Sequence, residues 1–122
     1  MPSQALAHRP LKAAICAYFE FAILNRQAWT ALYDFRLPEG SDAPQSYTVK
    51  VEAIFDIVIA EIAAVLRPDR REAAPALARS LLACVHGHCF FTINATFALL
   101  GETDPLGAAY ARVTDAIAAC NG

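Results

Sequence analysis

The sequence predicts an all-α domain, and three observations support this class. Glycine is sparse, with 5 glycines in 122 residues, while alanine is abundant. Apolar residues recur three and four positions apart over long segments, which is the spacing of one face of a helix. The alternation of apolar and polar residues that marks a half-buried strand is absent. A chain of this length is expected to form a single domain, residues 1–122, with about five helices.

Two helices are expected in the N-terminal part of the chain. The first runs from about Pro10 to Leu24, because proline is tolerated in a first helical turn. Its apolar stripe consists of Leu11, Ile15, Tyr18 and Ala22. A break near Asn25 leads into a short helix that ends at about Phe35. The segment RLPEGSDAPQS follows, and its two prolines and one glycine predict a loop.

The longest helices are expected after this loop. One runs from about Gln45 to Leu66 and carries a broad apolar face. After a turn at Arg67–Arg71, a long helix is predicted from Glu72 to Phe97. The last helix spans about Asp104–Cys120, because Asp104 is a good N-cap and proline follows it. The loop GETDP between these two helices is short, so we expect them to pack as an antiparallel pair.

The composition argues for a covered apolar surface and against nucleic-acid binding. Hydrophobic residues make up 57% of the chain and charged residues 18%, whereas typical domains have about 25% charged residues. A chain this small and apolar is expected to bury surface against a partner or an apolar ligand. The net charge is −2 and the basic residues form no face. The chain is therefore not expected to grip DNA by itself.

The cysteines and the N-terminus predict a cytoplasmic protein. Four cysteines lie in apolar stretches without a C-x-x-C motif, and the N-terminus lacks the pattern of a signal peptide. We therefore expect reduced, buried thiols rather than disulfides. No uninterrupted apolar run reaches the roughly 18 residues that a membrane span needs, so no membrane association is expected.

The segment LLACVHGHCFFTINATF, residues 81–97, concentrates histidine and cysteine and raises the question of a metal or catalytic site. Cys84 and His88 are four apart and could share one ligand, but His86 points roughly opposite to His88 on a helix. A cysteine nucleophile also needs an oriented base, and here only the spacing is met. No catalytic motif occurs elsewhere. We expect no metal, no cofactor and no enzymatic activity; a metal- or cysteine-dependent enzyme remains the third alternative.

The same segment predicts close helix packing. From His86 onward bulky apolar residues surround the helix, so we expect it to be buried on every side, with a second subunit covering part of it. Ser80, Ala83 and Gly87 form a stripe of small residues, and a mid-helix glycine costs about 1 kcal/mol relative to alanine. Close approach of another helix compensates for this cost. The pattern leaves open whether His86 or His88 faces a ligand cavity.

The run LLACVHGHCFF…GETDPLGAAYARVTDAI resembles the C-terminal end of TetR/AcrR-type transcriptional regulators, in which a histidine-glycine pair often sits in the long penultimate helix. The earlier stretch YFEFAILNRQAWTALYDFRLPEG is similar to the helix, short helix and loop that follow the family's DNA-binding part. The resemblance covers about Pro10 to Cys120. The family carries an N-terminal helix-turn-helix domain for which this chain has no room. We expect either a C-terminal fragment or a stand-alone relative, with DNA binding belonging only to the parent family.

The resemblance implies an effector-binding and homodimerisation domain of a TetR-like regulator, a repressor that senses a small, largely apolar molecule. The last two helices would pair with their copies into a four-helix bundle. The implied ligand-binding positions are Tyr18, Ala22, Trp29, Tyr33, Phe55, Val58, His86 and Phe90. The positions assigned to the dimer interface are Ser80, Ala83, Gly87, Phe91, Asn94, Tyr110, Val113 and Ile117. The alternative is a stand-alone, dimeric helical module with a binding or structural role and no role linked to DNA.

Overall fold

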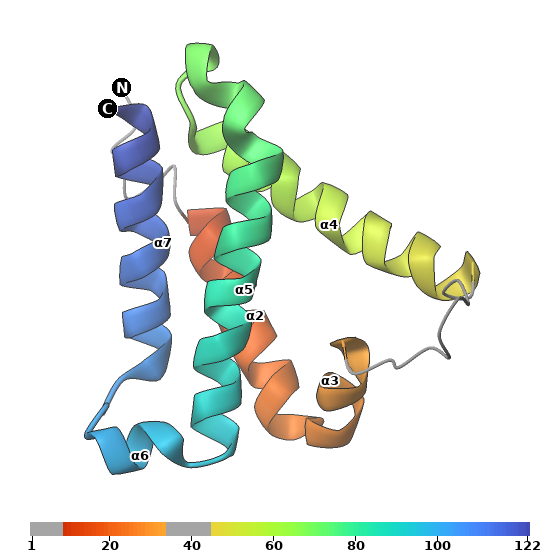
Figure 1. Cartoon of the computed structure of the whole chain (residues 1–122), viewed down its shortest axis with the longest axis vertical. Helices are drawn as coiled ribbons and strands as arrows, with labels where there is room; N and C mark the ends of the chain where they lie inside the picture. The colour runs from red at the N-terminus through yellow and green to blue at the C-terminus, as the bar shows by residue number, and fades with distance from the viewer. Residues whose placement is uncertain (1–8, 34–44) are drawn as a thin grey trace, which may run out of the picture.

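A computed structural model describes residues 9–33 and 45–122 of the chain (Figure 1). The described residues form six α-helices and one 3-10 helix and contain no strand, which confirms the all-α class. The elements in chain order are α2 (Arg9–Leu24), α3 (Arg26–Tyr33), α4 (Gln45–Val65), η1 (Pro68–Ala73), α5 (Ala74–Ile93), α6 (Thr96–Leu100) and α7 (Pro105–Asn121).

Helix α5 is the centre of the fold. It packs against α7, α4 and α2, whereas α3 packs against α2. In Figure 1, α7 lies beside α5 and runs in the opposite direction, with α6 joining the two at one end. The predicted antiparallel pairing of the last two long helices is therefore confirmed. Helix α4 slants away from this pair, and its C-terminal end is the part nearest to the start of α5.

The single helix predicted from Glu72 to Phe97 is split among three elements of the structure, η1, α5 and α6. Its first residues belong to the 3-10 helix η1, and α5 ends at Ile93. Ala95 has φ of +65°, the left-handed conformation, which stops the helix before α6 starts. The Asn94 side-chain oxygen accepts a hydrogen bond from the Thr96 N–H at 3.0 Å and supports this turn. The predicted C-terminal limit was therefore wrong, because alanine itself gives no signal for a left-handed residue.

The start of α7 follows the predicted capping chemistry. The Gly107 N–H donates to the Asp104 carboxylate at 3.1 Å, and Pro105 occupies the first helical turn. This bond satisfies one of the backbone donors that a helix start leaves without an intrahelical partner. Gly101, with φ of +82°, ends α6 in the left-handed conformation that glycine adopts without strain. Gly101 and Asp104 thus define the turn between α6 and α7, after which α7 runs back along α5.

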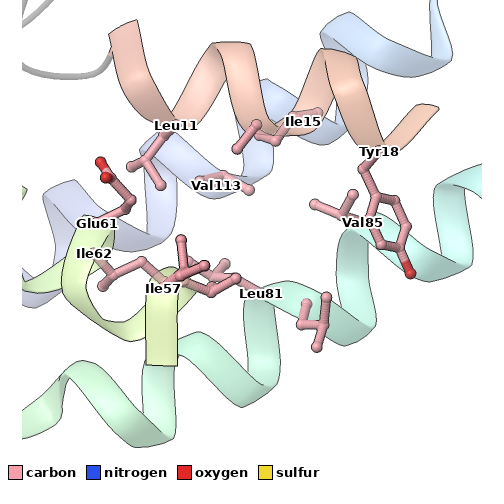
Figure 2. A pocket seen from close by; sticks show the side chains of 12 residues that line it. Leu11, Ile15, Tyr18, Ile57, Glu61, Ile62, Leu81, Val85 and Val113 are labelled. Atoms are coloured by element: carbon pink, nitrogen blue, oxygen red, sulfur yellow. The ribbon is translucent and has the colours of Figure 1, made fainter. Parts of the chain in front are cut away.

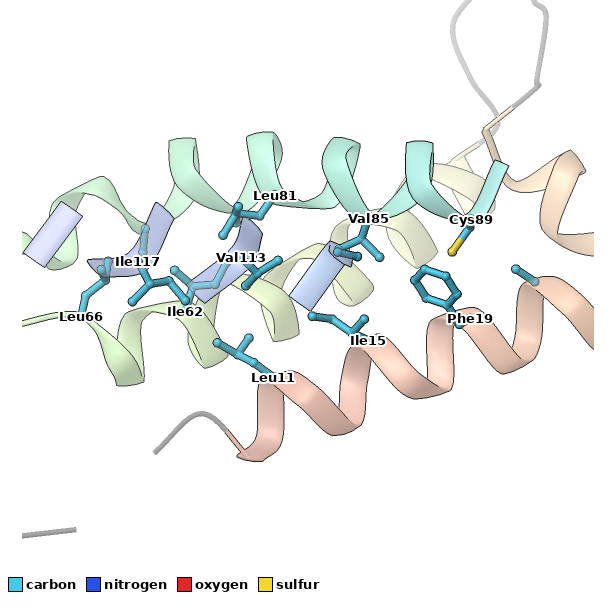
Figure 3. Close-up of a cluster of buried hydrophobic side chains, with 14 of the residues drawn as sticks. Leu11, Ile15, Phe19, Ile62, Leu66, Leu81, Val85, Cys89, Val113 and Ile117 are labelled. Carbon is cyan, nitrogen blue, oxygen red and sulfur yellow. The ribbon is translucent and has the colours of Figure 1, made fainter. Parts of the chain in front are cut away.

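The core is one cluster of apolar side chains between α2, α4, α5 and α7 (Figure 3). Its largest fully buried members are Trp29, Ile62, Cys89 and Ile117. Val113 and Ile117 point into this cluster and are 3% and 1% exposed. Both were predicted at a dimer interface, whereas in the protomer the apolar face of α7 packs inside the core. Helical spacing shows that a face is buried but does not show what covers it.

One helical stretch among the described residues, Pro68–Ile93, is long and apolar enough to cross a membrane by length and composition. The expectation from the sequence considered only uninterrupted apolar runs, whereas this stretch qualifies by its mean hydropathy although Arg79 interrupts it. Helices α2, α4 and α7 pack against α5, although only 22% of the apolar window is buried within the protomer. A single helix of this kind is weak evidence for a membrane span, because helices of soluble proteins also pass a test of length and composition. Length and composition alone therefore do not identify a membrane span here.

Candidate ligand pocket

An apolar pocket lies where α2, α4 and α5 meet, with one side chain from α7 (Figure 2). Its cavity volume is about 100 Å³. The lining residues are Leu11, Ala14, Ile15, Tyr18, Ile57, Val58, Glu61, Ile62, Leu81, Leu82, Val85 and Val113. Each of the three helices contributes consecutive turns of its inward side. The pocket therefore exists because the inner faces of α2 and α4 do not fully close over α5.

The size of the pocket limits what enters it. Pockets for drug-sized ligands typically have volumes of about 300–1,000 Å³, and an engineered apolar cavity of about 150 Å³ holds benzene. A cavity of about 100 Å³ accommodates a short alkyl chain or a comparably small apolar group. The lining residue Ile57 is 64% exposed, so the pocket is open to solvent on one side and a larger ligand would extend out of it.

Two side chains give the pocket its polar groups, and they lie at opposite ends of it. Figure 2 shows Glu61 beside Leu11 at one end and Tyr18 beside Val85 at the other. The remaining lining side chains are apolar. The Glu61 carboxylate makes no hydrogen bond or ion pair with any residue in the described ranges. The Tyr18 hydroxyl, in contrast, is held by a neighbour outside the pocket.

That neighbour is His86, which links α5 to α2 and α3. The Tyr18 hydroxyl lies 2.8 Å from His86 Nδ1, and the imidazole stacks on Trp29 with ring centroids 4.3 Å apart and an angle of 17°. Tyr18 meets Trp29 edge-on at 6.3 Å. Burial lowers the pKa of His86 from its ordinary value. A neutral imidazole can accept a hydrogen bond from the Tyr18 hydroxyl at Nδ1. The three side chains therefore form a connected cluster beside the pocket.

His88 points to a different part of the helix and is satisfied locally. Its Nδ1 lies 2.7 Å from the Cys84 carbonyl oxygen, to which it donates, and 3.8 Å from Cys84 Sγ. Its ring contacts Phe97 at 5.4 Å between centroids. Neither histidine is among the described residues that line the pocket, so which of them faces a ligand stays a prediction. His86 is the histidine that faces α2 and α3.

The Cys84–His88 pair lacks the features of an activated nucleophile. An Nδ1–H that donates to a carbonyl cannot at the same time accept the thiol proton. Burial raises the pKa of the Cys84 thiol, with Arg112 opposing the effect, and raises that of Cys89 to about 12. Both thiols therefore stay protonated near neutral pH, whereas nucleophiles and metal ligands need the thiolate. Within residues 9–33 and 45–122, no three His, Cys, Asp or Glu side chains gather as a metal site.

The predicted ligand residues are only partly brought together. Tyr18 and Val58 line the pocket, while Trp29 and Ala22 are fully buried beside it and Phe55 packs against the core. Phe90 is 49% exposed and is not among the residues that line the pocket. The Tyr33 side chain lies outside the described part of the chain. Sequence reasoning missed Leu81, Leu82 and Val85, although these residues form the apolar stripe that precedes His86 on α5.

The predicted interface residues on α5 form one exposed face. Ser80, Ala83, Gly87, Phe91 and Asn94 are all exposed, on the side opposite the buried residues of α5. A Cβ added at Gly87 would meet no heavy atom within 4 Å. Phe91 is 39% exposed in the protomer, so the expected burial of this helix on every side depends on a second subunit and stays a prediction. Tyr110 on α7 is half-buried, with the Lys12 ammonium 5.5 Å from its ring centroid.

Replacing His86 with glutamine is expected to flatten the dependence of stability on pH. Burial places the pKa of His86 below 6.5 in the folded chain, so the unfolded chain binds the proton more readily. The stability that depends on a neutral His86 is fully present above about pH 6.5. It is lost as the pH falls below that value, because the unfolded chain then binds the proton. Melting temperatures at about pH 7.5 and pH 5 should therefore differ less for His86→Gln than for the wild type. The control His88→Gln should keep the wild-type difference, and identical slopes in all three proteins would contradict the assignment.

A protein-family model described as "Tetracyclin repressor-like, C-terminal domain" matches residues 11–117. The match includes every helix that lines the pocket and the exposed face of α5. No curated protein and no solved structure gives a significant match to the chain. The matched range covers far more than half of the chain and begins at Leu11, one of the pocket residues on α2.

Proposed function

We propose, because the chain belongs to the tetracycline repressor-like C-terminal domain family, that it is the effector-binding and homodimerisation domain of a TetR-like repressor. Domains of this family are regulatory and non-enzymatic, and they generally dimerise and bind small-molecule effectors. The proposal assigns DNA contact to a helix-turn-helix domain separate from these residues. Regulators of the family are soluble cytoplasmic proteins, and we place this chain in the same compartment.

The observation that carries effector binding is the apolar pocket between α2, α4 and α5. Because its lining is mostly apolar, as in most small-molecule sites, we propose a small and mostly apolar effector. The pocket shares Tyr18 with the Tyr18–His86–Trp29 cluster, so a ligand that displaces Tyr18 also perturbs contacts of α2 with α3 and α5. An effector that binds one arrangement of these helices more tightly shifts the population toward it.

The observation that supports dimerisation is the outer face of α5, defined by Ser80, Ala83, Gly87, Phe91 and Asn94. We propose that this face packs against its copy, with α7 beside it. Val113 and Ile117 contribute by holding α7 on α5 from inside the protomer. Small side chains at the centre of the face permit a close approach of two helices. The exposed aromatic ring of Phe91 supplies apolar area that a second copy would bury.

Leucine at position 87 is the direct test of this interface. Because a side chain there meets nothing within the protomer, Gly87→Leu should leave the fold intact and even favour the helix by up to about 1 kcal/mol. Between two closely packed α5 helices the same side chain causes overlap. We expect the wild type to be a dimer at micromolar concentration and Gly87→Leu to weaken dimerisation at least about tenfold, measured by sedimentation equilibrium.

Ala53→Leu is the matched control, because Ala53 is also an exposed small residue in a helix but lies on α4. It should dimerise like the wild type, with both variants giving the wild-type circular dichroism spectrum. A wild-type dimer whose affinity is unchanged by Gly87→Leu would place the interface elsewhere. A monomeric wild type would remove the homodimer from the proposal.

A further inference from the structure

The pocket contains one charged side chain, and this charge specifies the ligand. Glu61 is the sole ionisable carboxylate or amine among the described residues that line the pocket. We infer that the pocket takes a small apolar molecule carrying a protonated amine, with the ammonium group facing Glu61. This inference rests on the proposed effector-binding function and narrows it to a chemical class.

The position of Glu61 orients such a ligand. Glu61 precedes the fully buried Ile62 on α4 and is itself half-buried, so its carboxylate lies between apolar walls and water. Figure 2 shows it at the Leu11 end of the pocket, with Tyr18 at the other end. The Tyr18 hydroxyl is bonded to His86, which leaves mainly the tyrosine ring to face the pocket. The ammonium therefore belongs at the Glu61 end and the apolar tail at the Tyr18 end.

The charge balance of the pocket favours a cation over a neutral or anionic ligand. Among the described residues, no arginine, lysine or histidine side chain lines the pocket, and Glu61 forms no ion pair with any of them. Binding an apolar tail removes water from the neighbourhood of the carboxylate, which is unfavourable unless an opposite charge replaces the lost hydration. A neutral ligand offers no such compensation, and a carboxylate ligand adds repulsion.

A series of three ligands with the same tail tests this inference. Hexylamine, hexanol and hexanoate share a six-carbon chain and differ in charge, because a primary amine is protonated at neutral pH as lysine is. Isothermal titration calorimetry on the wild-type chain should rank hexylamine first and hexanoate last. Because Glu61 is partly hydrated, we expect a moderate preference, with hexylamine binding about two- to fivefold more tightly than hexanol at low salt. The preference should shrink as salt is added.

Glutamine at position 61 isolates the charge. Glu61→Gln keeps the shape of the side chain and should weaken hexylamine binding about two- to fivefold while leaving hexanol binding unchanged. Glu52→Gln is the matched control, because Glu52 lies on the same helix, is exposed and does not line the pocket. It removes the same net charge and should leave all three affinities at their wild-type values. An equal effect of both variants would assign the preference to overall charge and overturn the role of Glu61.

Val58→Trp tests whether the ligands bind in this pocket at all, independently of their charge. Tryptophan at this lining position fills the cavity and should abolish binding of hexanol as well as hexylamine. Hexanol bound as tightly as hexylamine, and sensitive to Val58→Trp, would overturn the cationic class but support an apolar effector pocket. If none of the three ligands binds, or if Val58→Trp changes nothing, the pocket is not the effector site and the effector-binding part of the proposed function falls with it.

Discussion

Replacing Trp29 with alanine should destabilise the folded chain by about 3–5 kcal/mol, the range for truncating a large aromatic side chain in a core. Trp29 is 1% exposed, stacks on the His86 imidazole and meets the Tyr18 ring edge-on. It is also the main side chain through which the short helix α3 joins the core cluster. Its loss leaves a large void and removes an apolar wall from His86. Urea unfolding followed by far-ultraviolet circular dichroism measures the change.

Phenylalanine at the same position is the matched variant. The Trp29 indole N–H is buried and has no hydrogen-bond partner within the described part of the chain. A buried donor without a partner costs about 1–3 kcal/mol, so Trp29→Phe removes this cost while keeping an aromatic ring against His86. We expect Trp29→Phe to lose far less stability than Trp29→Ala. Equal losses in the two variants would mean that the N–H is satisfied in solution and that ring volume does not dominate.

The helices were predictable from the sequence because their signals are local. The N-cap at Asp104, the proline after it and the spacing of apolar residues gave the limits of α7 within one or two residues. The break at Ala95 was not predictable, because alanine favours helix and the left-handed conformation there depends on how α6 packs. Local propensity thus predicts the interior of a helix better than it predicts the residue at which the helix ends.

The candidate site was only partly predictable because it depends on how three helices cross. Spacing alone placed His86 and His88 on different sides of α5 but could not show that His86 meets Tyr18 and Trp29. Glu61 appeared to be one more polar residue of α4, and its neighbours in the pocket come from helices distant in the sequence. Buried faces were recognised, whereas the identity of the element that covers each face was not.

Replacing Ile117 with alanine should lower the free energy of unfolding by about 2–5 kcal/mol, as in other large-to-small core substitutions. Ile117 is 1% exposed and packs among Ile62, Leu66 and the other core side chains that hold α7 on α5. The substitution raises helix propensity slightly, so the loss arises from packing. Urea unfolding at several protein concentrations measures the change and separates it from dimer dissociation.

The same measurement in the Gly87→Leu background distinguishes a core residue from an interface residue. If Ile117 stabilises the protomer, the loss caused by Ile117→Ala is the same in the wild type and in the weakened dimer, because the two sites contribute independently. If Ile117 instead packs against a second copy, most of the loss disappears once dimerisation is weakened. The structure predicts the first result, since no more than 1% of Ile117 remains for a partner to cover.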